Sequence, residues 1–122
     1  MNKLRIAITI IIGTFFFACN NTNNNDHEKP ASISGEQLFK INCAQCHRPT
    51  EDFTGPALRN VASRWANKTM LYEFIKDPQS VIARDNYAKK LFEKWKQAYM
   101  QPFPNLSNEE IDNILNYCET AQ

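Results

Sequence analysis

Apolar and polar residues beyond residue 33 follow a helical period, and few segments have the alternation typical of strands. The pattern predicts a first helix from Gly35 to about Asn42, with apolar positions at Leu38, Phe39 and Ile41. Ser34 stands just before this helix and Gln37 follows three residues later, which is the spacing of a capping box. Gly35, Phe39 and Cys43 recur every four residues, so they are expected to share one face of the helix.

The last helix is predicted to begin after Ser107, because Glu110 completes a second capping box. Its apolar positions fall at i, i+3, i+4 and i+7, which gives one continuous stripe: Ile111, Ile114, Leu115 and Cys118. Cys118 is most simply a small core residue on this stripe. A disulfide between two copies of the chain through Cys118 stays open as an alternative.

The middle of the chain predicts two more helices. One runs from about Met70 to Lys76 and ends at Asp77-Pro78, because a proline disfavours helical backbone in the residue before it. The other is expected within Ser80 to Tyr99, where its apolar face consists of Leu91, Trp95 and Ala98. Residues 48–54 and the proline-containing segment 101–106 are predicted loops. The fold class is therefore all-α.

The first thirty residues differ from the rest in composition. Lys3 and Arg5 precede a mainly apolar run from Ile6 to Ala18, which is shorter than the about 20 residues that a transmembrane helix needs and is typical of an export signal. The end of the run resembles a bacterial lipoprotein cleavage site, which implies lipidation of Cys19. Ordinary cleavage near Ala18, with Cys19 a spare thiol, and an uncleaved anchor stay open. The polar segment 20–30 is expected to be a flexible tether.

These features divide the chain into a signal peptide (1–18), a lipid-anchored tether (19–33) and a folded domain (34–122), exported to the periplasmic side of a bacterial membrane. The chain has 14 basic and 13 acidic side chains, so loss of Lys3 and Arg5 with the signal leaves 12 basic side chains and a net charge of −1. This balance gives no support to nucleic-acid binding. Basic residues gather between Arg84 and Lys96, and such a charged surface can steer the docking of a protein partner.

The candidate chemistry lies in Cys43-Ala44-Gln45-Cys46-His47. A C-x-x-C-H pattern is typical of covalent haem attachment, in which each thiol bonds to one haem vinyl group and the histidine is the proximal iron ligand. Haem is attached outside the bacterial cytoplasm, so the export signal and the motif agree. We therefore expect one haem c, held by Cys43 and Cys46 and ligated by His47.

Three other interpretations of this motif are weaker. A thioredoxin-like redox pair needs a βαβ setting, which the strand-poor sequence does not offer. A structural zinc site needs a second ligand pair, for which only His27, Cys19 and Cys118 remain. A plain disulfide, or two buried thiols beside an accidental histidine, is the last alternative.

Several motifs together resemble class I c-type cytochromes over residues 34 to 120: the attachment motif, Gly55-Pro56, the proline-containing loop after Met100, and the aliphatic and aromatic pair Ile114 and Tyr117. The resemblance implies an all-α fold around one covalently bound haem, with the terminal helices crossing closely at Gly35. It also implies that the Pro56 carbonyl accepts a hydrogen bond from His47 and that Met100 is the sixth iron ligand. Met70 is the rival ligand. Arg64 and Trp65 are candidate partners of a haem propionate, with a core residue the open alternative for Trp65.

His/Met ligation leaves no iron position open to a substrate, so the expected function is electron transfer and not catalysis. The expected partners are redox proteins: a respiratory oxidase, reductase or dehydrogenase. Two alternatives stay open. One is a haem-based gas sensor or small haem enzyme with a displaceable sixth ligand. His27, in the tether, is a separate and remote candidate for a distal haem ligand. The other is a fixed cytochrome subunit of a respiratory complex.

Overall fold

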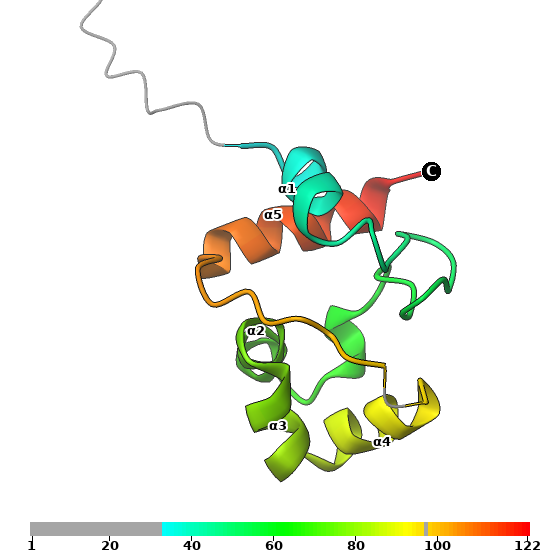
Figure 1. Ribbon diagram of the computed structural model, residues 1–122. Helices are drawn as coiled ribbons and strands as arrows, with labels where there is room; N and C mark the ends of the chain where they lie inside the picture. The colour runs from blue at the N-terminus through cyan, green and yellow to red at the C-terminus, as the bar shows by residue number, and fades with distance from the viewer. Residues whose placement is uncertain (1–32, 97) are drawn as a thin grey trace, which may run out of the picture.

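A computed structural model of the chain describes residues 33–96 and 98–122, and within these ranges the fold is helical without strands (Figure 1). The elements are α1 (Gly35–Asn42), the short 3-10 helix η1 (Ala62–Arg64), α2 (Lys68–Lys76), α3 (Pro78–Arg84), α4 (Asn86–Lys94) and α5 (Asn108–Thr120). The expected all-α fold class is confirmed. None of these helices is both long and apolar enough to cross a bilayer. The predicted signal peptide and most of the predicted tether, with Cys19 and His27, lie outside the described residues.

The two terminal helices, α1 and α5, cross at close range (Figure 1). A Cβ atom added to Gly35 would overlap the carbonyl oxygen of Asn113, so only glycine permits the crossing. One turn further on, the rings of Phe39 and Tyr117 pack with their centroids 5.4 Å apart. The predicted close crossing at Gly35 is confirmed.

A serine side chain caps the N-terminus of each of these two helices. The Ser34 hydroxyl accepts the Gln37 backbone N–H, and Gln37 accepts the Ser34 N–H in return. Ser107 and Glu110 make the same reciprocal pair at the start of α5. Both predicted capping boxes are therefore present. Helix α2 begins two residues earlier than predicted, because the Asn67 side chain caps it by accepting the Met70 N–H at 2.8 Å.

The single helix predicted within Ser80 to Tyr99 is wrong, because the structure has two helices there. The backbone at Asp85 is extended, with φ −114° and ψ 127°, and its carboxylate accepts the Ala88 N–H at 2.8 Å, which starts α4. Asp77 caps α3 in the same way and Pro78 occupies its first turn, a position that tolerates proline. Trp95 then ends α4, and Lys96 has a φ of 54°, so Ala98 does not extend the helix face.

Two apolar clusters form the core. One lies between α1 and α5 and contains Leu38, Phe39, Ile114 and Cys118. The other joins α2, α3 and α4 to the inner face of α5 and includes Trp65, Phe74, Val81 and Ile111. Cys118 is 0 % exposed, and burial raises the pKa of its thiol to about 12. Cys118 is therefore the core residue that the sequence predicted, and its thiol is not accessible to a second chain.

Replacing Gly35 by alanine tests the helix crossing. Alanine at a helical glycine usually stabilises a protein, but here the added methyl group collides with the backbone of α5. We expect Gly35→Ala to lower the free energy of unfolding by about 1–3 kcal/mol, the usual cost of overpacking, measured by denaturant unfolding of the haem-containing protein. Lys40→Ala, on the same helix at an exposed side chain outside the cavity, is the control and should have little effect. An unchanged or higher stability of Gly35→Ala would contradict the crossing.

Candidate functional site

A cavity of about 480 Å³ lies between the helices, within the roughly 300–1,000 Å³ that is usual for cofactor sites. Its walls come from the end of α1, the loop that follows it, α2, α4, the segment before α5, and α5 itself. Apolar side chains supply most of the lining, among them Leu58, Phe74, Leu91 and Leu115. Cys43, Cys46, His47 and Met100 all line this one cavity. The fold therefore brings together the predicted attachment motif and the predicted sixth ligand, although they are far apart in sequence.

The attachment motif is held by the turn that ends α1. Cys43 caps the helix, and its carbonyl oxygen accepts the N–H groups of Cys46 at 3.1 Å and His47 at 2.9 Å. This turn places both cysteines and the histidine beside the cavity. Both thiols are free; Cys46 is exposed, and burial raises the pKa of Cys43 to about 11.

The imidazole of His47 has a defined orientation and tautomer. Its Nδ1 lies 2.8 Å from the carbonyl oxygen of Pro56, which is the contact that the cytochrome resemblance implies. A carbonyl oxygen only accepts hydrogen bonds, so Nδ1 must carry the proton and Nε2 keeps its lone pair. Burial lowers the pKa of His47, although the hydrogen bond to Pro56 acts in the opposite direction. The lowered pKa favours the neutral ring. A neutral ring with a free Nε2 is the form that binds a metal.

Gly55 packs directly behind this ring. A Cβ atom at Gly55 would lie 2.5 Å from Cε1 of His47 and 2.9 Å from Nδ1, which is closer than real contacts allow. The Gly55 N–H donates to the carbonyl oxygen of Cys46 at 2.8 Å, so the loop returns to the attachment motif. The sequence predicts a role for Pro56 and none for the missing side chain of Gly55. A glycine beside a proline signals a turn, and nothing in the sequence shows that an imidazole fills the space of the missing side chain.

The two candidate methionines have different surroundings. Met100 is half-buried against the core and lines the cavity, and its segment is tied to α2 where the Phe103 N–H donates to the Ile75 carbonyl at 3.1 Å. The described lining does not include Met70, whose Sδ atom lies 3.9 Å from a guanidinium nitrogen of Arg84. Of the two candidate methionines, Met100 is the one that lines the cavity.

Polar groups at one end of the cavity fit the propionates of a haem. The indole Nε1 of Trp95 is buried, lines the cavity and has no hydrogen-bond partner, so a buried donor lacks an acceptor. A smaller adjoining cavity shares Trp95 and is bordered by the cations Arg64, Lys90 and Lys94. Haem carries two carboxylates that can accept from such donors. From the sequence, Trp95 is only an apolar position of a helix, and nothing there indicates this donor.

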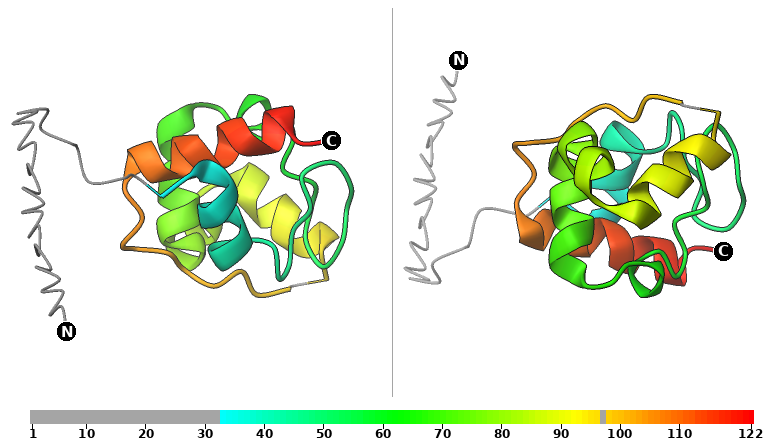
Figure 2. Two further views of the ribbon diagram at one scale, coloured as in Figure 1. Left: turned by 90° about the horizontal axis from the view of Figure 1, so that it is seen from above. Right: turned by 90° about the horizontal axis from the view of Figure 1, so that it is seen from below.

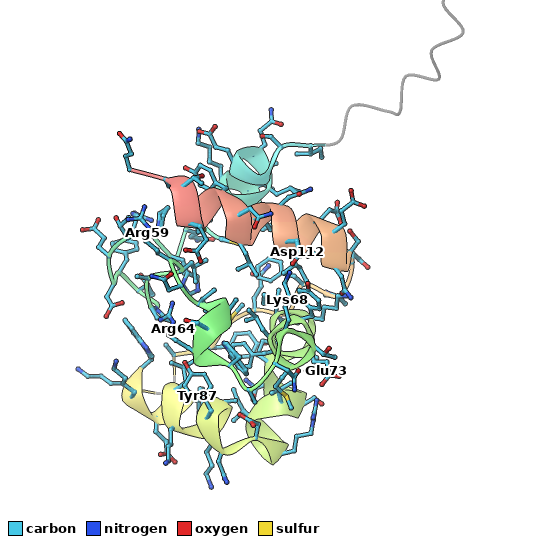
Figure 3. The ribbon with its side chains drawn as sticks, turned by 180° about the vertical axis from the view of Figure 1, so that it is seen from behind. Arg59, Arg64, Lys68, Glu73, Tyr87 and Asp112 are labelled. Atoms are coloured by element: carbon cyan, nitrogen blue, oxygen red, sulfur yellow. The ribbon has the colours of Figure 1, made fainter. Side chains whose placement is uncertain are left out.

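The two residues that the sequence proposed for a propionate also make contacts within the protein. Trp65 is buried in the core, with ring centroids 4.7 Å from Phe74 and 5.0 Å from Tyr87. Arg64 lies between the loop and α4 (Figure 3), and its guanidinium donates to the Ala57 carbonyl at 2.5 Å and to the Arg59 carbonyl at 3.1 Å. Arg64 thus holds the backbone that follows Pro56.

The loop that contains Gly55, Pro56 and Asn60 is also joined to the end of α5, which lies beside it in Figure 2. The Asn60 N–H donates to the Glu119 carboxylate at 2.8 Å, and Arg59 donates to the Ala121 carbonyl. On the opposite side, Lys68 lies 2.8 Å from Asp112, which joins α2 to α5 (Figure 3). These contacts hold the walls of the cavity together.

No group of three or more His, Cys, Asp or Glu side chains able to hold a metal ion occurs in the part of the chain that the structure describes. The described residues therefore offer no zinc site of the kind considered from the sequence. Cys19 and His27, which were candidates for such a site, lie outside those residues.

Comparison with known proteins agrees with the geometry. The family model described as "Cytochrome c" matches residues 32–122. A cytochrome c from Rhodothermus marinus is 32% identical, with a TM-score of 0.60 over 72% of this chain and 76% of that one. An engineered form of a Rhodothermus marinus cytochrome c is 36% identical, with a TM-score of 0.56 over 69% and 70%. The same engineered protein bound to a carbene intermediate gives a TM-score of 0.55. No curated protein matches.

Replacing Gly55 by alanine tests the packing behind His47. The methyl group would displace the imidazole, because its nearest ring atom is only 2.5 Å from the ideal Cβ position. We expect Gly55→Ala to reduce severalfold the fraction of chains that carry ligated haem, measured by the ratio of haem absorbance to protein absorbance after identical expression. Thr50→Ala, at an exposed residue of the same loop that does not line the cavity, should load normally. Equal loading of Gly55→Ala and the parent protein would show that the ring does not depend on this contact.

Proposed function

The chain belongs to the cytochrome c family, as a monohaem c-type cytochrome, and on that premise we propose that it carries single electrons between redox proteins. Its cofactor is one covalently attached haem c. In this proposal Cys43 and Cys46 hold the haem by thioether bonds, while His47 and Met100 are the axial iron ligands. The haem iron supplies the chemistry, since it takes up and releases one electron.

The observation that carries the proposal is that His47 and Met100 line the same cavity as both attachment cysteines. A histidine and a methionine on the iron occupy both axial positions, so no position is left for a substrate. Thioether sulfur favours ferrous iron, and the apolar lining disfavours the additional positive charge of ferric iron, so both raise the reduction potential. Because the same ligands serve both oxidation states, little rearrangement accompanies transfer of the electron. We therefore propose no catalytic role for any side chain.

The proposed partners are a respiratory oxidase, reductase or dehydrogenase on the periplasmic side of a bacterial membrane. Lipidation of Cys19 would hold the domain near that membrane. The lysines of α4 and the residues after it, Lys89, Lys90, Lys94 and Lys96, are exposed and support docking to a partner with an acidic surface. Arg84 contributes less to this surface, because it is paired with Glu73. The same surface suits a free electron carrier or a fixed subunit of a respiratory complex, and co-purification from mild detergent separates the two.

A second candidate function is a gas sensor or small haem enzyme in which Met100 leaves the iron. The observation that favours it is the weak anchoring of the Met100 segment. Between the Ala98 and Phe103 N–H groups, which donate to Trp95 and Ile75, no backbone N–H donates a hydrogen bond to a described residue. The similar solved structure that contains a carbene intermediate is that of an engineered protein, and it does not by itself favour this function.

Replacing Met100 by alanine tests the sixth ligand. Removing a thioether that favours ferrous iron should lower the reduction potential by on the order of 100 mV, since axial ligands set haem potentials over about 0.8 V. The potential is measured by voltammetry of the haem-containing protein. Met70→Ala is the matched control and should leave the potential nearly unchanged. A large shift for Met70→Ala, with none for Met100→Ala, would exchange the two assignments.

A further inference from the structure

Two hydrogen bonds meet on one peptide group beside His47. The carbonyl oxygen of Pro56 accepts from Nδ1 of His47 at 2.8 Å. The N–H of Ala57, which belongs to the same Pro56–Ala57 peptide group, donates to Oδ1 of Asp52 at 2.8 Å. A carboxylate, one peptide group and the imidazole therefore form a continuous hydrogen-bonded series that ends at Nε2 of His47.

Hydrogen bonds in series polarise one another. A carboxylate that accepts the N–H of a peptide group draws the proton toward itself and increases the negative charge on the carbonyl oxygen of that group. The Pro56 oxygen then accepts more strongly from Nδ1, and the imidazole gains anionic character. A more basic imidazole is a better ligand for ferric iron than for ferrous iron.

We propose that Asp52 is a positioning residue that acts on His47 through the Pro56–Ala57 peptide group and lowers the reduction potential of the haem. This inference rests on the proposed function, because it requires His47 to be an iron ligand. Asp52 thereby offsets part of the increase in potential that Met100 and the apolar cavity cause.

Asp52 differs in charge from the other charged side chains that lie near this peptide group. Among the described residues that border the smaller cavity, Arg64, Lys90 and Lys94 are cations and Asp52 is the acidic side chain. Arg64 donates to the Ala57 carbonyl, which belongs to the next peptide group along the chain. These cations favour ferrous iron, and Asp52 opposes them at the peptide group that contacts His47. Asp52 is exposed, so water screens the electrostatic effect of its charge on the iron through space. Water weakens the hydrogen-bonded path from Asp52 through the Pro56–Ala57 peptide group to His47 less.

The residue that follows Asp52 is held in place by the loop. The Phe53 N–H donates to the Gly55 carbonyl at 2.9 Å, and the guanidinium of Arg48 lies 4.0 Å from the centroid of the Phe53 ring. Arg48 in turn donates to the Ala44 and His47 carbonyls at 2.5 and 3.0 Å. The residue next to Asp52 is therefore tied to the attachment motif itself.

The test compares Asp52→Asn with Glu51→Gln in the haem-containing protein. Asparagine keeps the oxygen that accepts from Ala57 and removes the charge, so the loop keeps its bond. Glu51 is exposed and adjacent, so Glu51→Gln removes an equal charge at a similar place. We expect Asp52→Asn to raise the ratio of ferrous to ferric protein about threefold at a fixed solution potential, which is about 28 mV for a one-electron couple. We expect Glu51→Gln to give less than half of that shift.

A second readout follows the series itself. In the reduced protein, the NMR signal of the His47 Nδ1 proton should move upfield in Asp52→Asn, as a weaker hydrogen bond requires, and stay in place in Glu51→Gln. Equal potential shifts in the two variants with a stationary Nδ1 signal would reduce the effect to a general surface charge. An unchanged potential in Asp52→Asn would leave Asp52 a loop contact only.

The failure of this inference is distinguishable from failure of the proposed function. In either overturning outcome, the hyperfine-shifted ring protons of His47 in the oxidised parent protein would still identify it as an iron ligand. If those shifted signals are missing from His47 in the parent protein, the proposed ligation itself is wrong, whatever Asp52→Asn does.

Discussion

The hydrogen bond between Nδ1 of His47 and the Pro56 carbonyl is the contact on which the rest of the site depends. It commits one ring nitrogen to donation and leaves the other, Nε2, as the atom available to iron. Gly55 makes this possible because any side chain there would occupy the space of the ring. The bond and the missing side chain together give a half-buried imidazole one position and one tautomer.

The helices hold His47 and the Pro56 carbonyl in position relative to each other. Helix α1 delivers the attachment motif, and its crossing with α5 at Gly35 fixes the direction in which it does so. The end of α5 also holds the loop after Pro56, through Glu119 and the Ala121 carbonyl. The close packing of the terminal helices therefore supports both the histidine and the carbonyl that orients it. The segment with Met100 completes the cavity and is anchored to α2 at Phe103.

Local features of the sequence predicted much of this structure, and long-range contacts explain what they missed. The capping boxes at Ser34 and Ser107 depend on residues three positions apart, so the sequence located both helix starts. The sequence does not indicate the break at Asp85, because a polar residue there also fits the solvent face of a longer helix.

The site contacts that the sequence does not indicate depend on how the loops fold back on the cavity. They are the fit of Gly55 against His47, the unpartnered indole of Trp95 and the contact of Asp52 with Ala57. Residue types alone do not encode those distances. The proline-containing loop favours Met100 over Met70 as the sixth ligand, and Met100 is the methionine that lines the cavity.

We propose that protein side chains occupy both axial positions of the haem iron, so that the protein transfers electrons and does not bind substrates. The most direct test is the visible spectrum of the reduced haem-containing protein before and after carbon monoxide is added. The proposed ligation by His47 and Met100 predicts that the spectrum does not change. A prompt shift on addition of carbon monoxide would mean an open or labile sixth position, and would contradict the electron-transfer function in favour of a sensor or an enzyme.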